Sequence, residues 1–213
     1  NFNNRIKIIQ GDIRNKSFLN KIFQNSKDNN EPINAVIHFA GLKAVAESVV
    51  NPLNYWNVNV GGAINLIEVM GIHDCKTFVF SSSATIYGSP AEKFVNEDSQ
   101  IQPLNPYGKT KAAVEHFLND IFYSCPGEWR IANLRYFNPV GAHISGQIGE
   151  DPLDNPNNIF PILNRVASGK ISKLCVYGND WPTKDGTGVR DYIHVMDLAE
   201  GHVLTLNYLS NYE

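Results

Sequence analysis

A serine, a tyrosine and a lysine are spaced in this chain so that they can transfer a proton together. Ser83 ends a run of three serines, and Tyr107 precedes Lys111 by four residues. On a helix, residues four apart lie one above the other on one face. A phenol has an ordinary pKa of about 10, and a nearby ammonium lowers it by favouring the phenolate. We therefore predict that Tyr107 is a proton-transfer base, that Lys111 lowers its pKa, and that Ser83 holds the substrate oxygen or relays its proton.

The local pattern predicts a strand before the serines and a helix that carries the tyrosine. Thr77 to Phe80 is apolar and partly β-branched, and Pro106 suits a first helical turn. Strands and helices alternate along the chain, which predicts an α/β fold with a parallel, doubly wound sheet. The further strands are expected at Arg5–Gln10, Ala35–His38 and Arg130–Phe137. The helices are expected from Ser17, as the cap, to about Gln24, from Asn51-Pro52 to about Met70, and at Tyr107–Tyr123.

The amino-acid composition changes after Pro139. Residues 141–158 are rich in Gly, Pro, Asn and Asp, which is typical of an irregular connection. We expect a short helix at Ile159–Ser168, a strand at Leu174–Gly178, a loop at Asp180–Gly188 and a final helix at Val195–Leu209.

Polar or small residues follow four of the predicted strands. Asp12, residues 39–41, residues 81–83 and residues 136–138 all lie at such strand ends. Ligands of open parallel sheets bind beyond the carboxyl ends of the strands. The sequence therefore predicts one ligand site along this edge of the sheet.

Composition excludes several classes of function. The 213 residues can bury one core with room for a small second lobe, and 43% hydrophobic residues are ordinary for a globular protein. A net charge of −3 provides no basic field for nucleic acid, and no apolar run is long enough to cross a membrane. The three cysteines lie far apart and no histidine has metal-ligand spacing, so we expect reduced thiols in the cytoplasm and no metal.

Five longer motifs carry a resemblance to a known family. They are F-S-S-S-A-T-I-Y-G, N-P-Y-G-K-T-K, H-F-A-G-L-K-A-V-A-E-S, L-R-Y-F-N-P-V-G-A-H and D-G-T-G-V-R-D-Y-I-H-V-M-D-L-A. Together they resemble the UDP-glucose 4-epimerase family of extended short-chain dehydrogenases/reductases. The resemblance implies an NAD-binding Rossmann-type domain with a smaller substrate domain. It also implies interconversion of UDP-glucose and UDP-galactose through a 4-keto intermediate, in galactose metabolism, by a cytoplasmic homodimer with tightly bound NAD.

The resemblance also implies which residues contact NAD, and several have a plainer alternative. Asp12 would accept a hydrogen bond from the adenine amino group, or else cap the following helix. Lys43 would reach a ribose or phosphate oxygen, or else be a solvated turn lysine. Asn59 would support the cofactor pocket, or else only satisfy backbone groups. The implied NAD contacts are Asp12, Ile13, Phe39, Ala40, Gly41, Leu42, Lys43, Asn59, Ser81, Tyr107, Lys111 and Phe137.

A second set of residues is implied for the UDP-sugar. The planar fork of Arg190 suits a diphosphate, although a lone arginine is more often a surface residue. Tyr177 would offer a ring and a hydroxyl, or else be a partly buried strand tyrosine. The implied substrate contacts are Ser83, Asn138, Asn158, Ile159, Cys175, Val176, Tyr177 and Arg190.

One part of the family pattern is missing from this sequence. No G-x-G-x-x-G or G-x-x-G-x-x-G occurs, and that loop seats the cofactor pyrophosphate on a helix N-terminus. We therefore expect an internal piece of a longer enzyme, which lacks the glycine-rich loop and a C-terminal part. The expected divisions are 1–141 for the incomplete NAD domain, 142–188 for part of the substrate domain, and 189–213 for a strand and helix returning to the NAD domain. These 213 residues alone are expected to be inactive.

Two other functions fit parts of the pattern. A related NAD-dependent nucleotide-sugar epimerase, dehydratase or decarboxylase would share the fold, but the dehydratases carry an Asp-Glu pair where this chain has Ala84-Thr85. A non-catalytic NAD-sensing scaffold would commonly lose the tyrosine or the lysine, and both are present.

Overall fold

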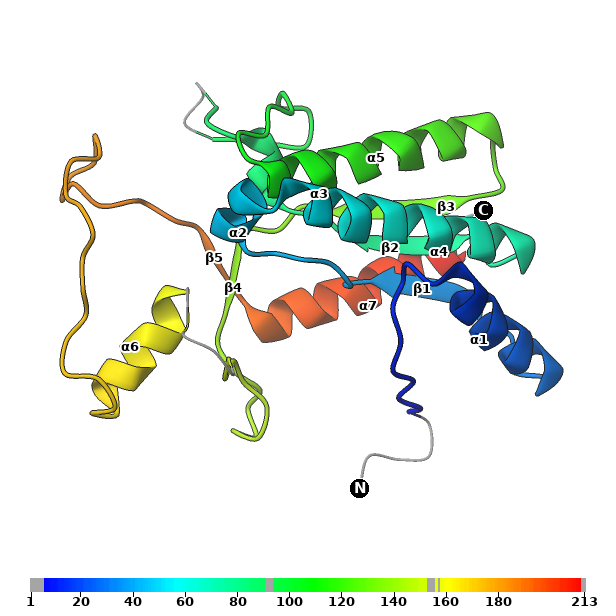
Figure 1. Ribbon diagram of the computed structural model, residues 1–213, viewed down its shortest axis with the longest axis horizontal. Coiled ribbons are helices and arrows are strands. Elements are labelled where there is room, and N and C mark those ends of the chain that lie inside the picture. The colour runs from blue at the N-terminus through cyan, green and yellow to red at the C-terminus, as the bar shows by residue number, and fades with distance from the viewer. Residues whose placement is uncertain (1–5, 91–93, 153–155, 157, 212–213) are drawn as a thin grey trace. The chain divides into compact units, whose positions relative to one another are not determined.

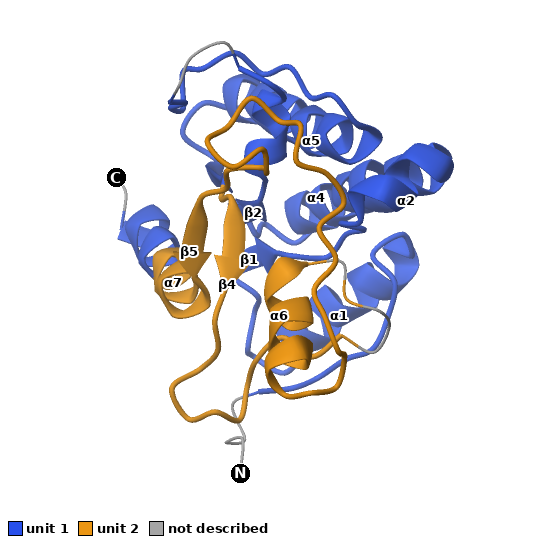
Figure 2. Ribbon diagram, turned by 90° about the vertical axis from the view of Figure 1, so that its left-hand side faces the viewer, with its two compact units in different colours: residues 1–135, 204–213 blue, residues 136–203 orange. Residues whose placement is uncertain are grey.

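The computed structural model describes residues 6–90, 94–152, 156 and 158–211. It divides the chain into two compact units (Figure 2). Unit 1 consists of residues 1–135 and 204–213, and unit 2 of residues 136–203. The three-part division drawn from the sequence stays a prediction.

Unit 1 is built on a parallel sheet of three strands. The strands β1 (Ala35–His38), β2 (Thr77–Ser81) and β3 (Arg130–Leu134) lie in the order β1-β2-β3. Both pairings are parallel, so the carboxyl ends of the strands meet at one edge. The central strand β2 ends in the serines, which places them at that edge. The predicted α/β class and parallel sheet are confirmed.

Helices surround this sheet, and Figure 1 shows α4 and α5 running side by side. The chain from Pro52 is one continuous helical segment, in which a π-helical part separates two α-helices. The helix α5 begins one residue before the predicted start. The elements of unit 1 besides the strands are α1 (Lys16–Asp28), α2 (Val45–Val50), α3 (Pro52–Tyr55), the π-helical η1 (Trp56–Gly61), α4 (Gly62–Ile72), the 3-10 helix η2 (Ala84–Tyr87), α5 (Pro106–Ser124) and the part of α7 (Val195–Asn211) from Leu204 on. The predicted helices at 52–70 and 107–123 are confirmed, whereas α2 and η2 were not predicted.

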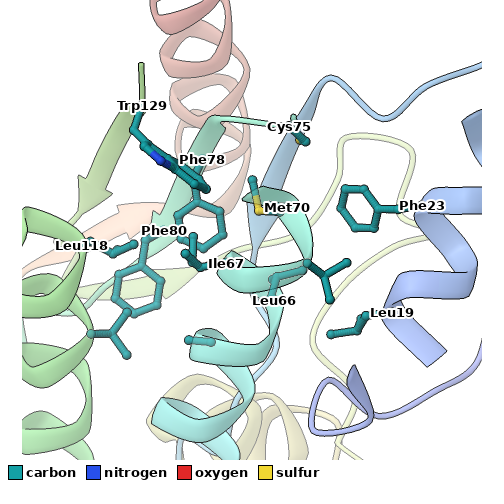
Figure 3. Packing of buried hydrophobic residues seen from close by; sticks show 13 residues of the cluster. Leu19, Phe23, Leu66, Ile67, Met70, Cys75, Phe78, Phe80, Leu118 and Trp129 are labelled. Carbon is teal, nitrogen blue, oxygen red and sulfur yellow. The ribbon is translucent and has the colours of Figure 1, made fainter. Parts of the chain in front are cut away.

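The main core of unit 1 lies between the sheet and its helices (Figure 3). Phe78 and Phe80 of β2 are fully buried, and Leu118 of α5 and Met70 of α4 belong to the same cluster. Burying a side chain of this size contributes about 1.5–3 kcal/mol. Because β2 is packed on this core, the backbone that carries the serines is firmly anchored.

The strand predicted at Arg5–Gln10 is wrong. Arg5 lies outside the described residues, and residues 6–10 have no strand structure. Ile6, Ile8 and Ile9 are exposed to solvent. The apolar alternation is present in the sequence, but a strand also needs a neighbour that pairs with its backbone. Among the described residues, no strand lies beside this segment, and β1 pairs with β2 alone.

The first helix begins and ends at other residues than predicted. Asn15 caps α1, because its side-chain oxygen accepts a hydrogen bond from the Phe18 amide at 2.9 Å. The helix continues to Asp28, beyond Gln24. The predicted cap at Ser17 is wrong because Asn15 stands one residue before the first helical residue, where a short polar side chain reaches an unpaired amide.

Unit 2 contains a two-stranded parallel sheet and helical segments. Its elements are β4 (Asn138–Val140), α6 (Ile159–Ala167), β5 (Tyr192–His194) and the part of α7 (Val195–Asn211) up to Val203. The predicted helices at 159–168 and 195–209 are confirmed to within two residues.

One strand prediction is confirmed with an earlier end, and another, within unit 2, is wrong. The strand expected at Arg130–Phe137 ends at Leu134, and β4 begins at Asn138 in a different sheet. Leu174–Gly178 is not a strand: no partner strand lies beside it in the described chain, and Tyr177 is 97% exposed. In the described residues, no helix is long and apolar enough to cross a membrane.

Candidate active site

Tyr107 stands in the first turn of α5, at the serine end of the sheet. The helix is capped by Asn105, whose side-chain oxygen accepts a hydrogen bond from the Gly108 amide at 2.8 Å, and Pro106 occupies its first position. Thr110 donates a hydrogen bond to the Tyr107 carbonyl at 2.7 Å. The positive end of a helix dipole stabilises a negative charge in its first turn. This position suits the role of proton-transfer base, which stays a prediction for Tyr107.

Lys111 is buried one helical turn after Tyr107. Its side chain donates a hydrogen bond from Nζ to the Ser81 carbonyl at 2.7 Å, and the residue is only 6% exposed. Nζ lies 4.8 Å from the centroid of the Phe80 ring and 5.9 Å from that of the Tyr107 ring. Burial lowers the pKa of Lys111 to about 8, so the group remains mostly protonated at pH 7. The effect of this cation on the Tyr107 hydroxyl stays a prediction.

Ser83 caps the short helix η2 and faces Thr85. The Ser83 hydroxyl shares a hydrogen bond of 2.8 Å with the Thr85 hydroxyl and accepts another from the Thr85 amide at 3.2 Å. The first turn of α5 packs closely here, because a Cβ added at Gly108 would meet the Thr85 carbonyl oxygen at 3.0 Å. Thr85 thus connects Ser83 to the first turn of α5, and Lys111 connects Ser81 to the same helix. The catalytic roles of Ser83, Tyr107 and Lys111 stay predictions.

His38, the last residue of β1, is a buried neighbour of this site. Its ring lies 5.7 Å and 5.9 Å, centroid to centroid, from the rings of Phe78 and Phe80. Burial, followed by the charge of Lys111, lowers the pKa of His38 to about 4. His38 is therefore neutral in the folded protein at pH 7.

The depressed pKa of His38 predicts a loss of stability in mild acid. The unfolded chain takes up a proton below about pH 6.5, whereas the folded chain does so only near pH 4, so stability falls as the pH drops through this window. The full difference corresponds to about 3 kcal/mol. Urea unfolding of His38→Leu should show a correspondingly shallower decline from pH 7 to pH 4. The matched variant His116→Leu changes an exposed histidine of α5 and should follow the wild type; equal slopes for wild type and His38→Leu would contradict the prediction.

The loop after β1 is tied to the helices by Asn59. The Asn59 amide accepts a hydrogen bond from Leu42 N–H at 2.7 Å and donates to the Leu42 carbonyl at 3.0 Å and to the Thr110 hydroxyl at 3.1 Å. Asn59 lies in the π-helical segment, a conformation frequent at functional sites. These hydrogen bonds correspond to the alternative stated from the sequence, in which Asn59 satisfies backbone groups. A role of Asn59 or of residues 39–43 toward a cofactor stays a prediction.

Asp12 does not cap a helix, which was the alternative to binding adenine. Its carboxylate accepts hydrogen bonds from Arg14, at 3.0 Å and 2.6 Å from the guanidinium and at 2.8 Å from the amide. The Arg14 side chain, the largest influence, lowers the pKa of Asp12 to about 2. Ile13 packs against α4, because a Cβ added at Gly62 would meet its Cδ1 at 2.4 Å. Adenine contacts of Asp12 and Ile13 stay predictions.

The residues expected to hold the UDP-sugar lie in unit 2, apart from Ser83. Asn138 donates a hydrogen bond to the Asp191 carbonyl at 2.7 Å, and Asn158 donates to Glu150 at 2.8 Å. Arg190 donates to the neighbouring Val189 carbonyl. Their substrate roles stay predictions, as do those of Phe137 toward the nicotinamide and of the exposed residues Ile159, Cys175, Val176 and Tyr177.

Sequence reasoning missed several residues that shape the site. Asn105 had a readable signal, since an asparagine directly before a proline is typical of a capped helix start. Thr85 was considered only as an acid or base, and its bond to Ser83 was not foreseen. The buried Glu115 and the half-buried Arg135 form an ion pair at 2.7 Å with no local sequence signal. In the described part of the chain, no group of acidic, histidine and cysteine side chains is placed to hold a metal ion.

Comparison with known proteins agrees with this geometry. Among curated relatives, a bifunctional UDP-glucose 4-epimerase and UDP-xylose 4-epimerase of Pisum sativum is 54% identical over 209 residues, which cover 98% of this chain and 58% of that protein. UDP-glucose 4-epimerase 2 of Arabidopsis thaliana is 54% identical over 208 residues, with the same shares. The solved UDP-glucose 4-epimerase from Bifidobacterium longum, in complex with NAD+ and UDP, superimposes with a TM-score of 0.87 at 46% identity, over 94% of this chain and 58% of that one.

The family assignment rests on nearly the whole chain. The chain spans about 58% of the length of the curated relatives it matches. A family model matches residues 1–212, a range that includes the serine segment, Tyr107 and Lys111. This chain therefore belongs to the NAD dependent epimerase/dehydratase family.

Proposed function

We propose that the protein is a UDP-glucose 4-epimerase, which interconverts UDP-glucose and UDP-galactose with bound NAD. The observation that carries the proposal is the buried Lys111, held at the Ser81 carbonyl with its ammonium 5.9 Å from the Tyr107 ring centroid. The printed activities of relatives that are 54% identical support the same reaction.

The residues present fit NAD. Asn59 fixes the backbone of Leu42, and Gly41 packs on the same side chain, because a Cβ added there would meet Asn59 Oδ1 at 3.0 Å, so the loop proposed to border NAD is held in place. The Lys111 ammonium has three N–H groups and gives one to Ser81, which leaves donors suited to ribose hydroxyls. When bound, NAD supplies a group that accepts a hydride from the hexose and returns it. We propose contacts from Asp12, Ile13, residues 39–43, Asn59, Ser81, Tyr107, Lys111 and Phe137.

The chain's own residues move and direct the proton. Tyr107 would accept the proton of the 4-hydroxyl while Ser83 holds that oxygen. Together with loss of the C4 hydride to the acceptor that NAD would supply, this would leave a 4-keto sugar. Lys111 keeps Tyr107 ionised before the transfer. After the sugar presents its other face, Tyr107 returns the proton and the configuration at C4 is inverted. We propose that Asn138, Asn158, Ile159, residues 175–177 and Arg190 hold the UDP portion.

Two other functions are less well supported. A sugar-nucleotide dehydratase needs an acid and a base beside the serine, and Ala84 and Thr85 stand there, with the Thr85 hydroxyl bonded to Ser83. A non-catalytic NAD-binding scaffold would have no use for a buried ammonium beside a tyrosine, because burial of that charge has an unfavourable free energy.

We also propose that the full-length protein is a cytoplasmic homodimer. Leu53 of α3, Ile64 of α4 and Tyr123 of α5 are exposed apolar side chains on helices that could pair with a second copy. Cys75, Cys125 and Cys175 are free thiols, which suits a reducing compartment. Sedimentation of the complete gene product would test the dimer.

The decisive experiment supplies the complete gene product with UDP-galactose and separates the products by chromatography. An epimerase yields UDP-glucose and reaches the same equilibrium from either sugar. A dehydratase yields a 4-keto-6-deoxy product instead, and a scaffold retains NAD but converts neither sugar. Either of these two results would overturn the proposal.

The 213 residues expressed alone are predicted neither to retain NAD nor to epimerise UDP-galactose. In the described residues the outer edge of β1 pairs with no strand, and an exposed strand edge promotes aggregation. The sequence also has no glycine-rich loop for a pyrophosphate. The measurement compares cofactor content and turnover of this chain with those of the complete gene product. A soluble, NAD-loaded and active chain would contradict it.

A further inference from the structure

In unit 1 the buried Glu115 forms an ion pair with the half-buried Arg135. Glu115 stands on α5 one helical turn after Lys111 and is 1% exposed. Arg135, which follows β3, donates hydrogen bonds from Nε to both carboxylate oxygens at 3.1 Å and from Nη2 to one of them at 2.7 Å. Neither residue has a part in the proton transfer described above.

The Glu115 carboxylate also binds the serine segment, residues 81–83. The buried Ser82 donates a hydrogen bond from its hydroxyl to Glu115. The preceding residue, Ser81, accepts the bond from Lys111 through its carbonyl. Two residues one turn apart on α5 thus hold two consecutive residues of the serine segment, and the next residue is Ser83.

Arg135 holds the other end of the same loop. Its Nη1 donates to the Tyr87 hydroxyl at 3.1 Å and to the Glu97 carbonyl at 2.8 Å. Tyr87 is the last residue of η2, the short helix that Ser83 caps. Both ends of residues 82–87 are therefore fixed to the same Glu115–Arg135 pair.

Stability alone is a weak reason for such a pair. Removing two charges from water is unfavourable, and apolar residues of similar volume often replace a buried ion pair with no loss of stability. The orientation of its bonds, toward Ser82 on one side and Tyr87 on the other, is specific to the loop that carries Ser83.

We propose that Glu115, fixed by Arg135, is a positioning residue that acts through Ser82 to hold Ser83 in register with Tyr107 and Lys111. The proposal rests on the proposed function, because Ser83 and Tyr107 are taken as its catalytic groups. A displacement of about 1 Å in a catalytic group can reduce a rate by about a hundredfold.

Ser82→Ala tests the contact with the smallest disturbance, since the Glu115–Arg135 pair remains. In the complete gene product we expect kcat to fall by about tenfold or more, because the loop moves, with KM for UDP-galactose and the thermal midpoint little changed. Amide hydrogen exchange should become faster in residues 81–88 and nowhere else. The matched control Ser124→Ala removes an exposed hydroxyl from the end of α5, where it donates to the Ile121 carbonyl, and should change none of these quantities.

A double replacement separates positioning from stability. Glu115→Met removes the ion-pair partner of the half-buried Arg135, which keeps only its bonds to Tyr87 and the Glu97 carbonyl, so it should lower the thermal midpoint as well as kcat. Glu115→Met with Arg135→Met removes both charges and should recover the midpoint, while kcat stays low because Ser82 still lacks its acceptor. Recovery of kcat together with the midpoint would overturn the proposal.

The exchange measurement keeps the two proposals apart. If the wild type converts no UDP-sugar, the epimerase function is rejected. If amide exchange at residues 81–88 is nevertheless faster in Ser82→Ala, the proposal that Glu115 fixes this loop through Ser82 is still supported. An active wild type whose Ser82→Ala variant has unchanged kcat and unchanged exchange would reject the positioning role alone.

Discussion

Replacement of Tyr107 by Phe is expected to reduce UDP-galactose turnover of the complete gene product by about a thousandfold, the range of a lost general base. The variant keeps the aromatic ring but removes the oxygen that accepts the 4-hydroxyl proton. Because the ring, the cap at Asn105 and the packing of Gly108 against Thr85 remain, the fold of the first turn of α5 should be unchanged. Binding of the UDP-sugar, measured by calorimetry, should be largely retained.

The matched control for this prediction is Tyr123→Phe. Tyr123 is an exposed residue at the other end of the same helix, where its ring lies edge-on to Phe122. Tyr123→Phe removes the same kind of hydroxyl group, and the turnover of this variant should equal that of the wild type. Substantial activity in Tyr107→Phe would show that another group takes the proton, and the assignment of the base would fail.

Local sequence patterns predicted the elements whose hydrogen bonds or buried faces are determined nearby. Three apolar residues and His38 form β1 (Ala35–His38), and the predicted run Thr77–Phe80 forms all but the last residue of β2. The proline at the start of α5 and the apolar spacing along it predicted that helix to within a residue at each end. Because Tyr107 and Lys111 share this helix, their relative position followed from the sequence alone.

The sequence pattern predicted the wrong structure for two segments that have no partner strand in the described residues. Residues 6–10 and 174–178 have the apolar, β-branched composition of strands, but neither is a strand in the structure. The pairing energy of a strand comes from a neighbour elsewhere in the chain, and no local pattern contains it. The end of β3 is a related case. Arg135 leaves the sheet to bind Glu115, and the strand stops one residue earlier although apolar residues continue.

Contacts between residues far apart in the sequence could likewise not be predicted. Glu115 and Arg135 are twenty positions apart, and their pairing depends on how α5 lies on the sheet. The bonds of Asn59 to Leu42 depend on the π-helical segment, for which the sequence offered only a Gly61-Gly62 pair inside a helix. The shared helix of Tyr107 and Lys111 was therefore predictable, whereas the contacts made by Glu115, Arg135 and Asn59 were not.

Lys111→Met is expected to abolish most turnover and at the same time to stabilise the folded protein at pH 7. The variant loses the charge that favours the Tyr107 phenolate, so the base is protonated at neutral pH and kcat should fall by about a hundredfold or more. Burial lowers the pKa of Lys111 from 10.5 to about 8, which corresponds to about 3 kcal/mol against the charged folded state. Loss of the bond to the Ser81 carbonyl offsets about 1 kcal/mol of this. Urea unfolding at pH 7 should therefore show a gain of about 1–2 kcal/mol.

The pH dependence of this gain separates the charge from simple packing. Between pH 8 and 10.5 the folded wild type has released the Lys111 proton while the unfolded chain still binds it, so the stability of the wild type rises with pH through this window. The advantage of Lys111→Met should shrink over the same range and be lost near pH 10.5. The control Lys109→Met removes an exposed charge two residues earlier on α5 and should show neither the gain nor its pH dependence. A gain that stays constant from pH 7 to 10.5 would mean that Met packs better than Lys for reasons unrelated to charge, and that the ammonium is not the group that burial opposes.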